Sequence, residues 1–321
     1  MHPLDRRLTA AEWSALRWSP VATAPFLVPT LGAPAVRDPT VLSADNRLDD
    51  LWHLWADSPL GIDHYTSPDG LRWSREDLVA AHAMGAHVRL LPEGLVMMYT
   101  RGPIAVAARG ALPFPARAEL VTRFGQTVYD WDTTTPTLTT SLPWFAAQGG
   151  GDWVSHPCLV HAGDRWKLYF SAGTASLGDG AVPRYVGMAE TDDLDLGFVP
   201  HPQPVLQPRA DTPEASVGAG SLKVFPCLGG GYAGLQTVYG VDPEGAPTAS
   251  LRLVHSLDGT LWSANDAPLL TLSGEGWARS HLGAVDAVAS GDHIHVYFSA
   301  CGDPSGWLAG SQVGRISARL P

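Results

Sequence analysis

The sequence lacks the features that define several protein classes. Its three cysteines, Cys158, Cys227 and Cys301, are odd in number and do not have the spacing of a metal site. They favour buried thiols in a reducing compartment over a disulfide framework. Basic residues are also scarce, since 21 Lys and Arg stand against 32 Asp and Glu and give a net charge of −11. Binding to a phosphate backbone needs concentrated positive charge, so nucleic acid is not an expected partner.

Long apolar runs are absent as well. The N-terminus carries Arg6 and Arg7, but Glu12, Trp13 and Ser14 follow instead of the roughly 7–15 apolar residues of a secretory signal. No segment reaches the about 20 apolar residues that cross a membrane. We therefore expect a cytoplasmic protein without membrane contact. The abundance of Ala, Gly and Pro is typical of chains from GC-rich bacteria.

Helical periodicity is nearly absent after the first residues. Residues 1–34 are predicted as a lead-in, in which Thr9 and Glu12 have the spacing of a capping box for one short helix near residues 10–16. Beyond them, short strands rich in Val, Leu, Tyr and Trp alternate with turns of Gly, Pro, Asp and Ser. This pattern predicts an all-β fold with many strands.

One layout recurs five times: a small or polar residue, a short β run, a turn and a more aromatic strand. It begins at Asp38 in A-V-R-D-P-T-V-L, with equivalent positions at about His87, His156, Ser221 and Gly283. A period of roughly 60 residues suits four antiparallel strands, and such units stacked radially form a propeller. We predict one five-bladed β-propeller domain over residues 35–321; a pair of β-sandwiches explains the repeats less well.

Two of the repeats share a longer similarity. The stretch H-Y-T-S-P-D-G-L-R-W begins at His64, and V-H-S-L-D-G-T-L-W begins at Val254. Asp-Gly supplies the backbone geometry of a hairpin, so Asp69 and Asp258 are predicted turn residues. The tryptophans that follow, Trp73 and Trp262, are expected to pack between blades.

The first strand of each propeller blade lines the central channel, so the residues that begin these strands converge at one end of the axis. The motifs at these places resemble glycoside hydrolase family 43 and related five-bladed sugar-cleaving propellers. The matching pieces are R-D-P-T-V at 37–41, G-A-H-V at 85–88 followed by L-V-M-M-Y-T, S-H-L-G-A-V at 280–285, and the D-G-x-x-W turns. The resemblance covers roughly residues 35–318.

The resemblance implies inversion at a sugar, with a base on blade one, an orienting aspartate on blade three and a glutamic acid on blade four. The two carboxyl groups of an inverting pair stand about 6.5–9.5 Å apart. Asp38 matches the base, His87 matches a blade-two histidine near the sugar, and His281 matches a blade-five histidine that often approaches a central calcium ion or water cluster.

Two positions depart from the family pattern. His156, in S-H-P-C-L-V, stands where the blade-three aspartate is expected, and Ala219 or a neighbour stands where the blade-four acid is expected. The nearest carboxylate is Glu214, the candidate acid. Asp38 with His87, His156 and His281 also suits a divalent transition metal such as zinc, iron or manganese, or acid–base work near neutral pH.

Further polar and aromatic residues near the predicted channel mouth fit a sugar-binding subsite and a propeller rim equally well. These candidates are Trp55, Asp57, Asp130, Trp131, Trp153 and Ser221. The leading hypothesis is a glycoside hydrolase-like enzyme acting on a small glycoside or a sugar-containing biosynthetic intermediate. The alternatives are a metal- or histidine-dependent lyase, isomerase or cyclase, and a sugar-binding propeller without catalysis.

Overall fold

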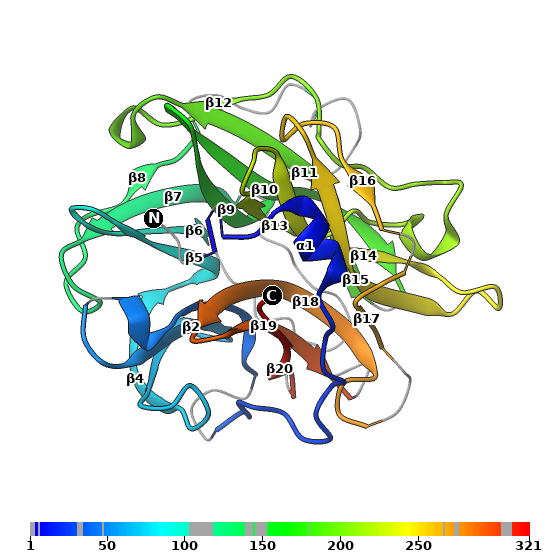
Figure 1. The fold of residues 1–321 in the computed structure, drawn as a ribbon, viewed down its shortest axis with the longest axis horizontal. Coiled ribbons are helices and arrows are strands. Elements are labelled where there is room, and N and C mark those ends of the chain that lie inside the picture. Colours follow the sequence, from blue (N-terminus) through cyan, green and yellow to red (C-terminus); the bar gives the residue numbers. More distant parts are fainter. Residues whose placement is uncertain are drawn as a thin grey trace.

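Five antiparallel sheets form a ring in the computed structural model (Figure 1), which confirms the predicted five-bladed propeller. The structure describes residues 4–5, 7–30, 35–46, 48–102, 118–138, 144, 153–178, 180–265, 267–272, 276–302 and 310–321. The innermost strands of neighbouring blades contact one another around the axis, and the first of them also contacts the last.

Each blade follows the chain from the axis outwards. Blade one contains β1 (Arg37–Leu42), β2 (Trp52–Ser58), β3 (Gly61–Ser67) and β4 (Ser74–Ala81). Blade two contains β5 (Ala83–Leu91), β6 (Gly94–Arg101), β7 (Glu119–Gly125) and β8 (Thr135–Pro136). Blade three contains β9 (Val154–Ala162), β10 (Arg165–Leu177), β11 (Gly180–Thr191) and β12 (Val199–Pro200).

Blades four and five complete the ring. Blade four contains β13 (Leu222–Pro226), β14 (Tyr232–Val241), β15 (Pro247–Ser256), β16 (Ser263–Ala264) and β17 (Leu270–Thr271). Blade five contains β18 (Ser280–Ser290), β19 (His293–Cys301) and β20 (Gln312–Arg319). The helical elements are α1 (Ala10–Ala15) and the 3-10 turns η1 (Ala44–Asn46), η2 (Leu194–Leu196) and η3 (Pro213–Ala215).

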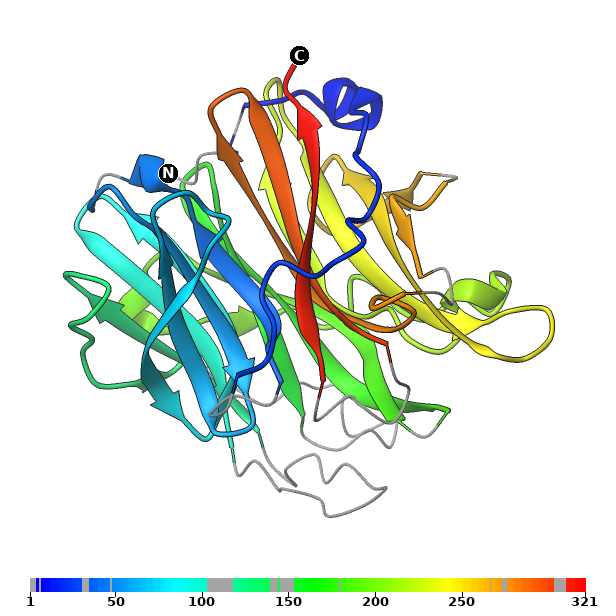
Figure 2. The ribbon, with the colours of Figure 1, turned by 90° about the horizontal axis from the view of Figure 1, so that it is seen from below.

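The N-terminal segment runs along the outer edge of blade five. The backbone N–H of Ser19 donates to the carbonyl of Ser317 at 2.8 Å, and that of Val313 donates to the carbonyl of Leu27 at 2.9 Å. Figure 2 shows this segment beside β20. Both ends of the chain therefore meet on one blade, which closes the ring.

Helix α1 confirms the predicted capping box. The Thr9 hydroxyl accepts the backbone N–H of Glu12 at 3.2 Å, and the Glu12 carboxylate accepts that of Thr9 at 2.7 Å. Trp13 is buried and stacks on Phe225, near the far end of β13, with ring centroids 5.3 Å apart. The helix thus covers the end of the ring at which the innermost strands finish (Figure 2).

A buried ion pair fastens the same lead-in to the channel. Arg89, late in β5, donates to the carboxylate of Asp5 and, at 3.0 Å, to the carbonyl of Leu159 on β9. The side chains of Arg89 and Asp5 are only 3% and 5% exposed. The lead-in is therefore anchored at the end of the ring where the innermost strands finish, opposite the end where they begin.

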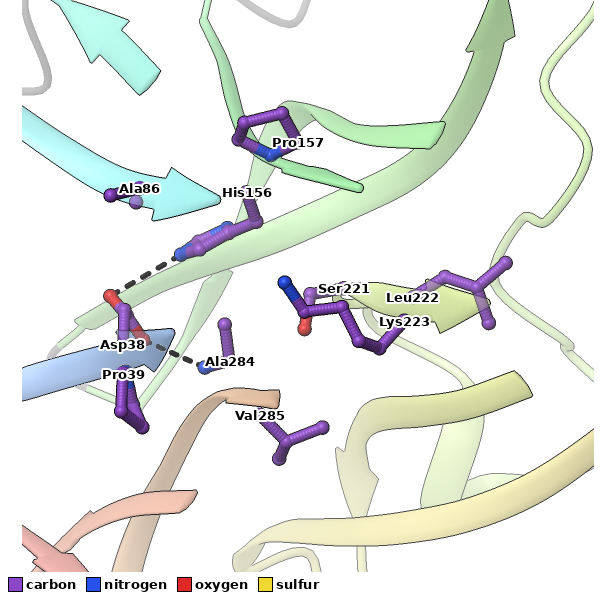
Figure 3. Close-up of a pocket in the computed structure, with 11 residues that line it drawn as sticks. Asp38, Pro39, Ala86, His156, Pro157, Ser221, Leu222, Lys223, Ala284 and Val285 are labelled. Atoms are coloured by element: carbon purple, nitrogen blue, oxygen red, sulfur yellow. Dashed lines mark hydrogen bonds and ion pairs between the residues drawn. The ribbon is translucent and has the colours of Figure 1, made fainter. Parts of the chain in front are cut away.

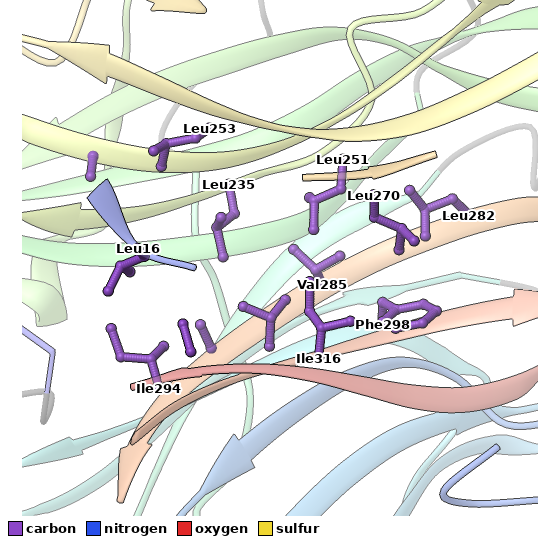
Figure 4. Close-up of a cluster of buried hydrophobic side chains, with 14 of the residues drawn as sticks. Leu16, Leu235, Leu251, Leu253, Leu270, Leu282, Val285, Ile294, Phe298 and Ile316 are labelled. Carbon is purple, nitrogen blue, oxygen red and sulfur yellow. The ribbon is translucent and has the colours of Figure 1, made fainter. Parts of the chain in front are cut away.

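Hydrophobic side chains fill the spaces between blades. Between blades four and five, leucines of β14 and β15 pack against branched side chains of β18 and β20 (Figure 4). Successive strand residues point to opposite faces, and both faces of a blade are covered, so most strands are apolar on both sides. Each fully buried Leu or Val side chain contributes about 1.5–3 kcal/mol to stability.

The repeated S-x-D-G turns have the predicted structure. Asp69 and Asp258 each accept backbone N–H groups from residues two and three positions further on, and these bonds lower the pKa of Asp69 to about 2. Trp262 lies edge-on to Tyr169 of blade three at 5.9 Å, and Trp73 lies edge-on to an aromatic ring of blade five at 6.4 Å. Both tryptophans pack between blades.

The three cysteines are buried free thiols, as expected. Within the described part of the chain, no helix combines the length and the apolar character needed to cross a lipid bilayer.

Candidate active site

One left-handed residue stands at the channel end of every innermost strand. The five residues are Asp38 (φ 48°), Gly85 (φ 62°), His156 (φ 48°), Gly220 (φ 66°) and His281 (φ 45°). In blades one, two, three and five, the hydrogen-bond register between the first and second strands shifts next to this residue, as it does at a β-bulge. Among non-glycine residues, Asp and His adopt this conformation more readily than most. The backbone therefore offers five equivalent positions, one per blade.

This equivalence refines the register of the sequence repeats. Asp38 and His156 occupy left-handed positions, as the repeat predicts. In blades two, four and five, however, the marker residues His87, Ser221 and Gly283 lie one or two positions further along the strand. A shift of two residues keeps a side chain on the same face of a strand but moves it deeper into the channel.

Asp38 is held from several sides (Figure 3). Its Oδ1 accepts the backbone N–H of Ala284 at 2.7 Å and lies 3.4 Å from the Ser299 hydroxyl, while its Oδ2 lies 3.3 Å from His156 Nε2. Burial opposes ionisation, but the charge and hydrogen bond of His156, the charge of Arg37 and the Ala284 N–H together lower the pKa of Asp38 below its ordinary value. Asp38 is therefore a carboxylate at neutral pH.

His156 is oriented by its two ring nitrogens. Because the Asp38 carboxylate only accepts hydrogen bonds, Nε2 donates to it, and Nδ1 lies 2.7 Å from the hydroxyl of Ser155. The buried ring of Trp153 stands edge-on at 5.9 Å. Ser155, His156 and Asp38 are not a nucleophilic triad, because Ser155 is fully buried and cannot meet a substrate. Ser155 and Trp153 instead fix the imidazole against Asp38.

Asp57, at the channel end of β2, is a second buried carboxyl group beside Asp38. Burial and the negative charge of Asp38 raise its pKa well above the ordinary value, and the two carboxyl groups share a hydrogen bond. Both Asp57 oxygens lie 2.8 Å from the backbone nitrogen of Gly85, which donates to them. Asp57 therefore keeps its proton to higher pH than an ordinary aspartic acid, and it lies beside Asp38 rather than among the residues that line the cavity, where the sequence hypothesis placed it.

The raised pKa of Asp57 predicts a pH dependence of stability. The folded protein keeps a proton that the unfolded chain loses above about pH 4, so the free energy of unfolding falls by up to about 1.4 kcal/mol per pH unit above that value, until the folded group ionises. Asp57→Asn, which has the same shape and no titration, is expected to flatten this slope. Urea unfolding between pH 4.5 and 7.5 measures how the free energy of unfolding depends on pH. Identical slopes for the parent protein and Asp57→Asn would contradict a raised pKa of Asp57.

A second polar layer lies deeper in the channel. Lys223 Nζ donates to His87 Nδ1 at 2.8 Å and lies 3.6 Å from Asp286 Oδ1. The other Asp286 oxygen accepts the Thr40 hydroxyl at 2.8 Å. His87 is thus a buried partner of Lys223 and is not among the residues that line the cavity.

The transition-metal hypothesis does not fit this arrangement, and the calcium hypothesis stays a prediction. Within the described ranges, no three His, Cys, Asp or Glu side chains are grouped so that they could hold a metal ion. The Nδ1 atom of His87 already accepts a hydrogen bond from Lys223 Nζ, so it is not available as a metal ligand, and a charged Lys223 would repel a metal ion. His281 does not line the cavity; its ring lies near Gly180 of the hairpin between β10 and β11.

The space at the centre of the site is small. Its volume of about 10 Å³ is room for a single water molecule. All five blades contribute to its lining, which consists of Asp38, Pro39, Gly85, Ala86, His156, Pro157, Ser221, Leu222, Lys223, Ala284 and Val285 (Figure 3). Ser221 is placed here as expected, and its hydroxyl lies 3.0 Å from that of Thr237.

Three other candidate residues lie away from the cavity. Trp55 is completely buried and stacks on His64 with ring centroids 4.9 Å apart, so it has no surface for a sugar. Asp130 and Trp131 follow the end of β7, at the face of the ring opposite the cavity. The sequence could not separate the two faces, because polar aromatic loops occur at both.

Glu214 is also outside the cavity. It lies exposed in η3, which packs against Gly240 of β14, and it is not among the lining residues. Ala219, which is buried, precedes the left-handed Gly220 of blade four. In the part of the chain that the structure describes, blade four therefore brings no carboxyl group to the cavity.

Some residues of the site were missed at the sequence level, notably Lys223, Asp286, Ser299 and Ser155. Lys223 and Asp286 had a usable signal, because each interrupts an apolar innermost strand, in S-L-K-V-F and G-A-V-D-A-V. A charged residue is rarely buried without a partner. Ser299 and Ser155 had no comparable signal.

The fold is a five-bladed propeller of the kind found in the glycoside hydrolases with which its structure was compared. No protein-family model matches the sequence, and no curated protein matches it. Among solved structures, the catalytic domain of a glycoside hydrolase family 62 α-L-arabinofuranosidase from Coprinopsis cinerea is 13% identical, with a TM-score of 0.67 over 94% of this chain and 97% of that one.

Two more solved structures have the same architecture. The α-L-arabinofuranosidase from Podospora anserina, in complex with cellotriose, is 13% identical with a TM-score of 0.64 over 93% of this chain and 96% of that one. A thermostable family-43 glycoside hydrolase is also 13% identical, with a TM-score of 0.61 over 88% of each chain. The chain therefore has the family 43-like propeller fold that the sequence motifs suggested.

Proposed function

We propose that this protein is a glycoside hydrolase-type enzyme that transfers a small sugar to water, with Asp38 as the base. The observation that carries the proposal is the one-water space beside the ionised Asp38 carboxylate. In the proposed step, the oxygen of the water bonds to the anomeric carbon, its proton passes to Asp38, and the bond to the leaving group breaks. His156 and the Ala284 N–H keep the carboxylate in place.

The leaving group is the second part of the proposal. No carboxylic acid of blade four lies at the cavity among the described residues, and loss of a general acid costs about 10²–10⁴-fold in rate. We therefore propose substrates whose leaving group departs without being protonated. Asp57 does not replace the acid, because it is buried beside Asp38 and outside the cavity lining.

Glycosyl fluorides test this, because fluoride leaves without a proton. In a panel of pentosyl and hexosyl fluorides of both anomers, we expect turnover of at least one member and at least 100-fold lower kcat/KM for its methyl glycoside. Glu214→Gln is expected to keep kcat/KM within twofold. Comparable turnover of the methyl glycoside, or loss of activity in Glu214→Gln, would show that an acid is present after all.

A sugar-binding propeller without catalysis is the second candidate, and the buried Ala219 beside the blade-four position favours it. Calorimetry with the same sugars separates the two. Saturable binding combined with no turnover of any fluoride would support the binding protein and contradict the enzyme.

A further inference from the structure

A groove of about 390 Å³ lies between blades two and three, at the face opposite the cavity. Its walls come from the turn between β5 and β6, the end of β7, the start of β10 and the residues that follow β11. Small-molecule sites usually occupy about 300–1,000 Å³, so the groove has the size of a ligand site, whereas the central cavity has room for only one water molecule.

Aromatic and aliphatic side chains form the inner part of the groove. Phe124, Trp166 and Leu194 line it, and each is half-buried against the core between the two blades. The Trp166 ring is supported by the ring of His161, with centroids 4.5 Å apart. Part of each aromatic surface therefore remains available to a ligand.

The rim of the groove is acidic. Four carboxylates contribute to it: Glu93, Asp192, Asp193 and Asp195. Asp192 binds Arg165 at 2.6 Å, and Asp193 caps η2 by accepting the backbone N–H of Asp195 at 3.0 Å. Neither Glu93 nor the Asp195 carboxylate forms an ion pair within the described ranges, and no Lys, Arg or His is among the described residues that line the groove.

From this combination we propose that the groove binds a small organic cation, a quaternary or primary ammonium group on a short apolar body. The electron-rich faces of Trp and Phe attract such cations within about 6 Å of the ring centre, and the attraction increases when water is excluded. Glu93 and Asp195 supply the opposite charge. A neutral sugar would gain the ring contacts but would leave the charge of the rim uncompensated.

This site is independent of the proposed hydrolysis. From Gly85 at the cavity to Leu91 at the groove, β5 spans six residues, which is about 20 Å. Activity toward glycosides is therefore not needed to test the groove, and loss of the groove does not affect the argument about Asp38.

Isothermal calorimetry with choline and with its neutral isostere, 3,3-dimethylbutan-1-ol, tests the proposal directly. We expect choline to bind with a stoichiometry of one and at least tenfold tighter than the alcohol. The double substitution Glu93→Gln with Asp195→Asn is expected to weaken choline at least tenfold, and Trp166→Leu is expected to weaken it further. Asp292→Asn, an exposed acid of blade five, is the matched control and should bind as the parent does.

Three results would overturn the proposal: equal binding of choline and the alcohol, unchanged binding in the double variant, or binding of a neutral trisaccharide to the groove in preference to choline. Trp166→Leu also removes packing, so circular dichroism accompanies it. The Glu93 and Asp195 substitutions are at the exposed rim and decide the question without that complication.

Discussion

Replacing Asp38 with asparagine is expected to lower the hydrolysis of glycosyl fluorides by about 10²–10⁴-fold, because it removes the group that takes the proton from water. Asparagine has the same size, and its carbonyl can still accept the Ala284 N–H. The measurement is kcat/KM on the best fluoride of the panel, with thermal unfolding to confirm that the fold is intact.

The pH profile adds a second, sharper expectation for the same residue. Because the pKa of Asp38 is lowered, the acidic limb of the rate profile should lie below the pH at which an ordinary aspartic acid titrates. His156→Ala removes the largest stabilising contact of the carboxylate, so the acidic limb of the profile should move to higher pH. Asp292→Asn serves as the control. A fully active Asp38→Asn protein would rule out this residue as the base.

Asp5→Ala is expected to lower the free energy of unfolding by about 3–5 kcal/mol, an effect far from the site. The substitution leaves the guanidinium of Arg89 buried with its carboxylate partner removed, and breaking a buried ion pair on one side has this magnitude. Urea unfolding followed by tryptophan fluorescence measures the change.

The partner variants make the Asp5 result interpretable. Asp5→Leu combined with Arg89→Met removes both charges and is expected to recover most of the lost stability. Asp292→Ala breaks the exposed pair with Arg319 instead, and it should change the free energy of unfolding by less than about 1 kcal/mol. If Asp5→Ala lost no more than this control, the lead-in would not be fastened by the ion pair.

The sequence was sufficient for the fold because a propeller repeats its signals. A single S-x-D-G turn is weak, but its recurrence at Asp69 and Asp258, each followed by a tryptophan, defines equivalent strands in two blades. The capping box at Thr9 is local and was equally readable. The pairing of residues 18–27 with β20 was not, because it joins segments about 290 positions apart and carries no pattern of its own.

Site residues could be predicted only where the residue and its immediate neighbours form a recognisable sequence motif. Asp38 before Pro39, and His156 before Pro157, stand out in any repeat alignment. The pairing of Lys223 with His87, and of Asp57 with Asp38, depends on the positions of strands relative to one another, to within a few ångströms. Glu214 was predicted near the channel mouth because it is the carboxylate nearest in sequence to the blade-four position. It precedes Ala219 by five residues, and this separation places it on an exposed 3-10 turn.

The five left-handed positions also set how this protein can change over evolutionary time. An exchange between Asp and His alters the chemistry at one blade, and both residues adopt the left-handed conformation more readily than most. The glycine positions differ in this respect: a Cβ at Gly220 would lie 2.1 Å from the carbonyl oxygen of Thr237, whereas at Gly85 its nearest neighbour would be 3.0 Å away. A Cβ at Gly85 would thus press on the backbone nitrogen of His156, and one at Gly220 would collide with the backbone of its own blade, so a side chain can be exchanged most readily at the left-handed positions of blades one, three and five.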